Sequence, residues 1–543
     1  MMKTRRLIIG VAAASGLAAA ASGQFQTPTR LIALSDTPAP DSDGSTYRVF
    51  YTPTINASGD VAFMSIIDTT PGSPFTDLEE GVWATNAGTL ELVQREGLVA
   101  PGTDGVPYFG FKQRVAMGDN GDVSFFGTVF VGDGTIDSTN DEGLWQGRAG
   151  TTMLLGRQGD AAPDVPGAVI AQVGEDFALI DNSRLVVQGR MVVGPGGVTT
   201  ETERALWQQT ASGLELVHRE GDSAPGSTFT FGSFTELVGN SSGDFAFLGS
   251  AGTQAGIWRN TGGTTELVAR SRLAAPGTNG QLFDQFSSGS IFYDDRFPMN
   301  ESGAVAFKGR LSTLGSLSQA EDTGIWSDHG GELTLIARES QPAAGTDATF
   351  GDFRTRNLDM NDAGTIAFNT FLIGGTGGVG SNTAIYVGDR NGLDLLVREG
   401  DAAPGAPGAN FLALTTSGNQ TASEFQIGIN NRSDIAFIAD IRRPGFTRNS
   451  RGLWAYSALQ DEIVPIVIED GFFDISPAQD GSMFRVVTGI SFDAETGFNN
   501  AGQLTFLLDF DDGSEGIFVT TIPAPGVLAL GAAVGVLAAR RRR

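Results

Sequence analysis

Residue types that support nucleophilic or metal chemistry are scarce in this sequence. Cysteine is absent, and histidine occurs only at His218 and His329. Without thiols the chain can form no disulfide, no thiolate zinc site and no cysteine nucleophile. The two histidines belong to different segments, so a histidine metal site or a Ser-His-Asp triad would need an unusual meeting in space. We therefore expect no catalytic residue and no bound cofactor.

Acidic side chains are the remaining candidates, and they gather in two polar segments, at residues 133–142 and 509–515. Calcium prefers several carboxylate and carbonyl oxygens on flexible loops. Neither segment has the spacing of an EF-hand loop or a nonapeptide repeat, so a solvated acidic loop is the favoured interpretation. The lesser hypothesis is a calcium site, with candidates Asp133, Asp137, Asp141, Asp511 and Asp512. A glycosidase-like pair of carboxylates stays open, because among 62 acidic residues some pair always has a suitable separation.

An arginine recurs at one position of a repeated segment, often followed by glutamate, as in Arg95-Glu96 and Arg398-Glu399. A ring of arginines could bind a ligand. A residue that recurs in every unit usually serves the unit, so we favour arginines that pair with carboxylates or bond loop carbonyls between units. The series consists of Arg95, Arg157, Arg219, Arg270, Arg338 and Arg398.

The elements that would position these side chains come from a tandem repeat. Its clearest copy is Asn-Ala-Ser-Gly-Asp-Val-Ala-Phe at residues 56–63, and copies begin at residues 56, 118, 181, 240, 300, 361, 430 and 499. The copy that begins at residue 181 is the most eroded. The residues that define the better copies are Asn56, Gly59, Phe63, Asn240, Gly243, Phe247, Asn300, Gly303, Phe307, Asn361, Gly364, Phe368, Asn430, Phe437, Asn499, Gly502 and Phe506.

Two further segments follow each copy. One ends in an aromatic residue in all eight units, including Trp83, Trp258, Trp326 and Trp454. The next carries the arginine and then Ala-Pro-Gly, as at residues 92–102. A segment with phenylalanines, such as residues 109–111, could add a strand, so each unit has three or four strands.

The chemistry of the motif is that of a turn that leads into a strand. Asparagine bonds backbone groups two residues on, glycine supplies a positive φ, and alternating apolar residues fill one face. A small alanine beside a large phenylalanine suits close packing of one sheet on the next. Four short strands per unit of about 62 residues fit the blade of a β-propeller. We therefore predict an all-β fold, with one eight-bladed ring favoured over two smaller propellers, an open array or a β-sandwich.

The phase of the repeat supports a closed ring. The body opens at residues 30–34 with a sequence that resembles the third segment of a unit, and it ends at residues 516–518 with the second. The two ends are thus complementary parts of one unit. In a ring, the first strand completes the last sheet and covers edges that would otherwise invite aggregation.

Both ends of the sequence have the pattern of processing signals. Lys3, Arg5 and Arg6 precede an apolar run and small residues, which predicts a secretory signal peptide over residues 1–23 and export by Sec-type machinery. At the other end, Pro523 and Pro525 precede a short apolar stretch and four arginines, Arg540, Arg541, Arg542 and Arg543. We expect residues 523–543 to anchor the protein to the cell envelope or cell surface.

The charge balance limits the partners. Both terminal segments lack acidic residues and together contain seven of the 35 basic ones, so the rest of the chain has 28 basic against 62 acidic residues. A surface of this sign repels phosphate backbones, which argues against nucleic-acid binding.

The repeat resembles that of a family of exported bacterial proteins defined by tandem NxxGxxAF motifs and by interchangeable C-terminal anchors. The resemblance covers about residues 28–522 and implies a surface-displayed repeat protein without an established reaction. The C-terminus resembles a PEP-CTERM sorting signal, which implies processing by an exosortase-like enzyme. Ala524 stands where that signal usually has glutamate.

These observations predict a non-catalytic scaffold or binding module with a surface protein or a glycan as partner. The alternative is a secreted hydrolase or lyase that acts on polysaccharide. Long connections between the first and second segments should all lie on one face, which we expect to be the recognition surface. They span residues 129–141, 191–203, 309–322, 371–382 and 441–450.

Overall fold

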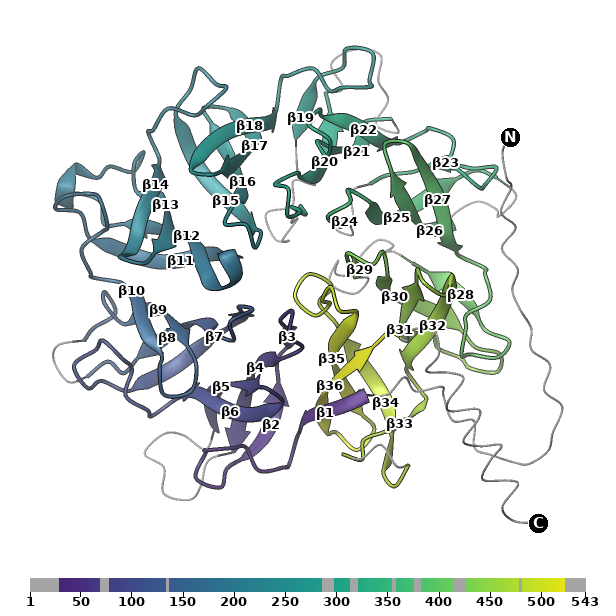
Figure 1. Ribbon diagram of the computed structural model, residues 1–543, viewed down its shortest axis with the longest axis horizontal. Helices are drawn as coiled ribbons and strands as arrows, with labels where there is room; N and C mark the ends of the chain where they lie inside the picture. The colour runs from purple at the N-terminus through teal and green to yellow at the C-terminus, as the bar shows by residue number, and fades with distance from the viewer. Residues whose placement is uncertain are drawn as a thin grey trace.

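A computed structural model describes residues 29–68, 78–132, 136–285, 297–312, 321–353, 358–375, 382–414, 426–477 and 481–522. The strands form eight antiparallel sheets that follow one another around a ring (Figure 1). Within these ranges there is no α-helix, only the 3-10 turns η1 (Asp181–Ser183) and η2 (Pro195–Gly197). The chain is an eight-bladed β-propeller, which confirms the fold predicted from the repeat.

Each blade is numbered by the unit of the repeat that it contains. Blade 1 comprises β2 (Thr46–Phe50), β3 (Thr54–Ile55), β4 (Val61–Asp68), β5 (Leu78–Asn86) and β6 (Thr89–Arg95). Blade 2 comprises β7 (Tyr108–Met117), β8 (Val123–Val129), β9 (Glu142–Gly147) and β10 (Met153–Arg157). Blade 3 comprises β11 (Ile170–Ile180), β12 (Arg184–Met191), β13 (Arg204–Thr210) and β14 (Gly213–Arg219). Blade 4 comprises β15 (Phe231–Gly239), β16 (Phe245–Ala251), β17 (Gln254–Thr261) and β18 (Thr264–Arg270).

The second half of the ring repeats this order. Blade 5 comprises β19 (Phe283–Gln285), β20 (Ala306–Leu311), β21 (Thr323–Ser327) and β22 (Thr334–Arg338). Blade 6 comprises β23 (Thr349–Phe350), β24 (Leu358–Met360), β25 (Ile366–Ile373), β26 (Asn382–Asp389) and β27 (Gly392–Arg398). Blade 7 comprises β28 (Asn410–Ala413), β29 (Ile427–Ile429), β30 (Ile435–Arg442), β31 (Ser450–Ser457) and β32 (Glu462–Ile468). Blade 8 comprises β33 (Phe472–Asp474), β34 (Phe484–Ser491), β35 (Gln503–Phe510), β36 (Glu515–Thr521) and β1 (Thr29–Leu34).

The ring closes within blade 8, as the phase of the repeat predicted. The N-terminal strand β1 pairs antiparallel with the C-terminal strand β36, with Leu31 opposite Phe518. In Figure 1 the purple β1 lies beside the yellow β36. One sheet therefore joins the two ends of the described chain, and β1 covers the edge that β36 would otherwise expose.

Neighbouring blades pack a bulky face against a face of small residues. Phe63 and Trp83 of blade 1 lie in one buried cluster with residues of blade 8. Ala62 and Ala84, on the opposite face of the same sheet, lie in a cluster with Tyr108 and other large residues of blade 2. The alternation of small and large residues in Val-Ala-Phe thus builds the interface between successive blades.

The strands alternate in direction, so the connections fall on two faces of the ring. The face that carries the NxxGxxAF turns also carries the hairpins between third and fourth strands, and we call it the turn face. The opposite face carries the connections between second and third strands and those between blades, and we call it the loop face. The long connections that were expected on one face all begin and end on the loop face.

The predicted terminal signals, at residues 1–23 and 523–543, lie outside the described residues. In the part of the chain that the structure describes, no helix is long and apolar enough to cross a membrane.

Candidate functional site

The asparagine of the repeat first organises its own turn. The Oδ1 atom of Asn300 accepts hydrogen bonds from the backbone N–H groups of Ser302 at 3.1 Å and Ala304 at 3.0 Å. Asn56 makes the same two bonds in blade 1. Gly303 has a φ of 81°, which explains the glycine in the motif.

The other half of each amide joins successive blades. The Nδ2 atom of Asn300 donates to the carbonyl oxygen of Asn361 in blade 6 at 3.4 Å, and Asn499 of blade 8 donates to Asn56 of blade 1 at 2.8 Å. The same bond runs from Asn56 to Gly118, Asn240 to Asn300, Asn361 to Asn430 and Asn430 to Asn499. This chain of bonds crosses the closure between blades 8 and 1, so it supports the ring directly.

A second set of bonds runs beside the first and was not predicted. The residue after the asparagine accepts a hydrogen bond from the N–H of the equivalent residue in the preceding blade, as when Glu301 N–H donates to Asp362 at 3.0 Å. The acceptors are Asp119, Glu301, Asp362, Asn431 and Asn500. The residue type varies at this position, but most copies carry an acidic or amide side chain there. That shared chemistry is the feature of the sequence from which these bonds could have been predicted.

The aromatic residue of the second segment is buried between strands and loop. Trp258 stacks on Phe247 with ring centroids 6.0 Å apart, and its Nε1 atom donates to the carbonyl oxygen of Pro225 at 3.0 Å. The same stack forms in six further blades, with Tyr386 or Phe518 in place of tryptophan in two of them. In the six blades that carry a tryptophan, its bond to the proline carbonyl fixes the loop that enters the blade, whereas Tyr386 of blade 6 bonds the carbonyl of Ala344.

The recurrent arginines lie near the loop face and contact their own blade. Arg95 pairs with Glu79 at 2.8 Å and with Asp43 at 2.6 Å. Arg338 donates to the carbonyl of Glu321, Arg398 to the side chain of Asn382, and Arg157 lies 3.8 Å from Asp160. Arg270 donates to the carbonyl of Gly226, and the N–H of Arg219 bonds Asp222. These contacts hold the fourth strand to the third strand or to a nearby loop.

Blade 1 departs from this scheme at Glu80. In blades 5 and 6 the equivalent residue is a threonine that bonds the glutamate after the arginine, as Thr323 bonds Glu339 at 3.1 Å. In blade 1 it is Glu80, which places a second carboxylate near Glu96. Burial, together with the charge of Glu80, raises the pKa of Glu96 to about 8.

Two of the described calcium candidates, Asp137 and Asp512, are engaged in local turns. Asp137 accepts from the N–H of Thr139 at 2.8 Å, and Asp512 accepts from the N–H of Ser514 at 3.0 Å and pairs with Arg485. Asp511 accepts from the N–H of Val486, and burial raises the pKa of Asp141. Asp133 lies outside the described residues. Among the residues that the structure places, no group of three or more His, Asp or Glu is arranged to hold a metal ion.

The two histidines lie in different blades and at different positions of the repeat. His218 on β14 bonds Thr265 at 2.7 Å and packs on Phe231, and burial lowers its pKa. His329, in the hairpin between β21 and β22, lies 3.2 Å from the amide of Asn300.

A cavity of about 860 Å³ lies at the centre of the ring, lined in large part by the first strands of the blades. One carboxylate of its lining, Asp359, bridges blades, and so does Asp176, which pairs with the lining residue Arg114. Asp359 accepts from the N–H of Ile429 at 2.7 Å, and burial raises its pKa to about 7. Asp176 accepts from the N–H of Leu237 at 3.1 Å and pairs with Arg114. Both carboxylates therefore hold first strands together.

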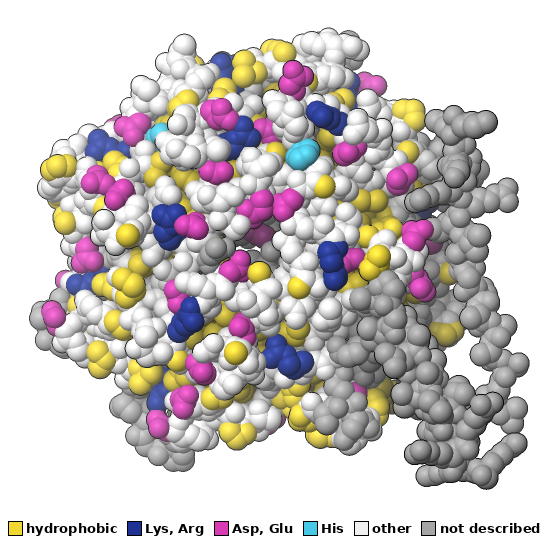
Figure 2. Space-filling view, viewed as in Figure 1, with side chains coloured by type: hydrophobic (Ala, Val, Ile, Leu, Met, Phe, Trp, Pro, Cys, Tyr) yellow, Lys and Arg dark blue, Asp and Glu magenta, His cyan; other side chains and the backbone are white. Residues whose placement is uncertain are grey.

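The two faces differ in their exposed apolar residues. Of the large apolar side chains that are exposed in the described ranges, all but Met153 and Leu459 lie at the loop face. Phe109 is 55% exposed and forms an edge contact with Phe130, with ring centroids 6.1 Å apart. The others are Leu98, Val99, Val131, Val192, Val193, Phe229, Leu273, Leu282, Ile373, Phe446, Phe472, Met483 and Phe484. In the view of Figure 2 acidic and basic side chains are interspersed around the central opening.

The family model that matches is described as a family of unknown function, DUF7453. It matches residues 9–179, 108–254 and 248–529, which together span most of the sequence. The chain belongs to this family. No curated protein matches the sequence.

Solved structures similar to this DUF7453 chain include two lyases and a peptidase. An oligogalacturonate lyase in complex with manganese is 11% identical over 92% of this chain and 98% of its own, with a TM-score of 0.32. A Pyrococcus horikoshii acylaminoacyl peptidase is 9% identical over 86% of this chain and 58% of its own, with a TM-score of 0.36. A PL25 ulvan lyase is 9% identical over 92% and 94%, with a TM-score of 0.31.

Proposed function

We propose that this protein is an exported, envelope-anchored binding module that recognises a surface protein or a glycan through its loop face. The observation that carries the proposal is the distribution of exposed apolar side chains, which gather on the loop face. Exposed apolar side chains that contact each other mark interaction surfaces, and Phe109 and Phe130 form such a pair. Its NxxGxxAF motif and C-terminal pattern support export by Sec-type machinery and handling by an exosortase-like enzyme.

The repeat itself supports a scaffold more than a catalyst. Its asparagine, tryptophan and arginine side chains are engaged in contacts within and between blades. The loop-face side chains differ from blade to blade, and residues on loops of a rigid frame are where binding sites usually lie. The function then depends on the loops, and the repeat keeps them in place.

Full-length protein on arrays of defined glycans and of surface proteins tests the proposal. The double substitution Phe109→Ser, Phe130→Ser removes the exposed aromatic pair. We expect the double substitution to weaken binding of the ligand at least tenfold, because the loss of each phenylalanine ring removes a large contact area. Leu459→Ser is the matched control, because Leu459 is 70% exposed but lies on the turn face.

Equal binding by the loop-face variant and the Leu459 variant would contradict a loop-face site. For each ligand that binds, the products are also examined by mass spectrometry. Cleavage of a bound polysaccharide would favour the alternative function, a hydrolase or lyase.

One observation favours that alternative at a particular place. Glu80 and Glu96 are close to each other at the loop face, and the pKa of Glu96 is raised to about 8, which suits a general acid. If the protein cleaves a polysaccharide there, Glu96→Gln should abolish cleavage and leave binding of the intact polymer in place.

A further inference from the structure

Two grooves on the turn face are built from the same positions of the repeat. One, of about 350 Å³, lies between blades 4 and 5 and includes Arg259 and Glu266. The other, of about 460 Å³, lies at blade 1 and reaches blade 2, and it includes Ala84 and Glu91. Arg259 pairs with Ala246 and Glu266 in the sheet, and Ala84 pairs in the same register with Ala62 and Glu91.

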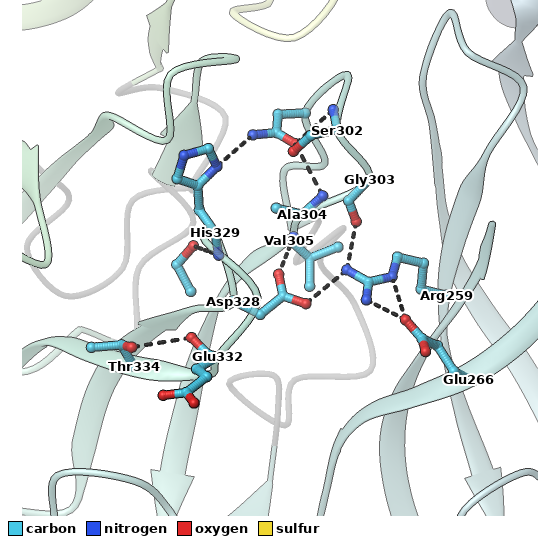
Figure 3. A network of polar contacts seen from close by, with 12 residues as sticks. Arg259, Glu266, Ser302, Gly303, Ala304, Val305, Asp328, His329, Glu332 and Thr334 are labelled. Carbon is cyan, nitrogen blue, oxygen red and sulfur yellow. Dashed lines mark hydrogen bonds and ion pairs between the residues drawn. The ribbon is translucent and has the colours of Figure 1, made fainter.

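In the groove between blades 4 and 5 a guanidinium group fills the space. Figure 3 shows Arg259 between Glu266 on its own blade and Asp328 and Gly303 on the next. Its Nη1 atom lies 2.7 Å from the carboxylate of Asp328 and donates to the carbonyl of Gly303 at 2.8 Å, and its Nε atom donates to Glu266 at 3.1 Å. The side chain is only 19% exposed.

A second arginine makes the same contact with the motif at another interface. Arg30 of blade 8 donates from Nη2 to the carbonyl of Gly59 in blade 1 at 3.1 Å. Arg30 stands on the fourth strand, where blade 4 has Glu266, so it reaches the glycine carbonyl from a different position. The carbonyl of the motif glycine is therefore a recurrent acceptor for a guanidinium group.

The groove between blades 1 and 2 keeps the acceptors but has no arginine at the position of Arg259, and its own arginines, Arg30 and Arg148, come from other positions of the repeat. Ala84 stands in place of Arg259, and the carboxylate of Glu91 and the carbonyl of Gly121 correspond to those of Glu266 and Gly303. Among the described residues no hydrogen bond or ion pair reaches either of these acceptors. Gly147 takes the place of Asp328, so the carboxylate that pairs with Arg259 has no counterpart here.

We propose that the groove between blades 1 and 2 is a binding site for a guanidinium group supplied from outside the chain. The group takes the place that Arg259 occupies three blades away, with Glu91 as its counter-ion and the carbonyl of Gly121 as a second acceptor. A planar guanidinium suits this arrangement because it offers several N–H groups in a fixed fork.

The charges at the groove agree with a cationic ligand. Arg148 lines it, but its Nε atom donates to Asp122 at 2.9 Å, and Arg30 is engaged at Gly59. Asp119 adds a carboxylate at the wall that blade 2 contributes. The net charge of −27 for the whole chain also attracts cations to the surface.

Calorimetric titration of the full-length protein tests this site with two probes. Agmatine offers a free guanidinium, and the capped tripeptide acetyl-Gly-Arg-Gly-amide offers one on a polypeptide. Binding of both shows that the group suffices, whereas binding of the peptide alone points to an arginine of a protein partner. Either result supports the site only if binding of the probe changes in the variants Glu91→Gln and Ala84→Arg.

Glu91→Gln should weaken binding about tenfold, because it removes the charge from one charge-assisted hydrogen bond. Ala84→Arg should abolish binding, because the new side chain can occupy the groove as Arg259 does. If Ala84→Arg fails to fold, Glu91→Gln still decides. Absence of binding by both probes, or binding that neither substitution alters, would overturn the proposal.

The reverse change gives an independent readout. Arg259→Ala should empty the groove between blades 4 and 5 and create a second site, so the stoichiometry rises from one guanidinium to two. Agmatine should then raise the melting temperature of this variant more than that of the wild type. These sites lie on the turn face, so their failure would leave the proposed loop-face function untouched, and the reverse also holds.

Discussion

The asparagine of the repeat uses both halves of its amide. Its oxygen closes the local turn, and its nitrogen donates to the next blade. Asp181, at this position in blade 3, donates from its backbone N–H to the carbonyl of Asn240 in blade 4, and its carboxylate pairs with Arg184 of its own blade. Gly118, at the same position in blade 2, has no amide at all, so the ring tolerates the loss of some side-chain links.

Asn300→Ala is expected to lower the free energy of unfolding by about 1–3 kcal/mol, because it leaves buried N–H and carbonyl groups without partners. Urea unfolding at pH 7 measures the change. Asn391→Ala is the control, since Asn391 is exposed and bonds only within its own hairpin. An Asn300 variant as stable as the control would show that the bond to Asn361 contributes nothing measurable.

Glu96 predicts a particular dependence of stability on pH. Its folded pKa of about 8 lies above the value near 4.3 of an unfolded glutamate. Between these values the folded state binds the proton more tightly, so this group favours folding at low pH and loses that contribution as the pH rises towards 8. We expect the difference in stability between pH 5.5 and pH 8.5 to shrink in Glu96→Gln.

Two further substitutions separate burial from charge in that prediction. Glu80→Gln removes the neighbouring charge but keeps an oxygen that can accept the bond from the N–H of Phe111, so it should shift the transition to lower pH. Glu332→Gln, at an exposed glutamate, should leave the pH dependence unchanged. Equal pH profiles for the wild type and both Glu80 and Glu96 variants would show that the carboxylates titrate normally.

At the scale of strands, the sequence predicted most of what repeats. Phe63 was expected at an interface between sheets, and it stacks there on Trp83, because both aromatic residues repeat at fixed register. The additional strand suggested by residues 109–111 is present as β7, the first strand of blade 2. The split of the first strand into β2 and β3, and its counterparts in blades 6 and 7, could not be predicted, since irregular turns at the centre of the ring have no periodic signal.

The pairing of β1 with β36 predicts that the first strand matters more than other outer strands. Leu31→Pro removes an N–H from the ladder and should lower the melting temperature and raise hydrogen exchange in blades 1 and 8. Leu267→Pro is the matched control, because Leu267 holds the same place on the outer strand of blade 4. If both prolines have equal effects that stay within one blade, the pairing of the chain ends does not hold the ring together.

At the scale of the whole molecule, the two faces differ in their exposed apolar side chains, and this difference can be recognised only in the folded structure. The sequence placed the long connections on one face but gave no means to find that Phe109 and Phe130 are exposed and in contact, since exposure depends on neighbours distant in the chain. The same holds for the groove at Ala84, which is recognisable only beside its counterpart at Arg259. Departures from the repeat become informative once equivalent positions can be superimposed in space.

The excess of acidic residues predicts how salt affects the whole ring. Self-repulsion of a chain with a net charge of −27 opposes the compact state, and dissolved ions screen it. We expect the melting temperature to rise by several degrees between about 10 mM and about 500 mM NaCl, with most of the rise below the concentration at which the screening length is about 10 Å. A fall over this range would mean that attractive ion pairs, such as Arg95 with Glu79, outweigh the repulsion.

The same measurement in CaCl2 at matched ionic strength tests the acidic loops. Stabilisation beyond that seen in NaCl would require a specific calcium site. Asp512→Asn or Asp137→Asn should then remove the additional stabilisation.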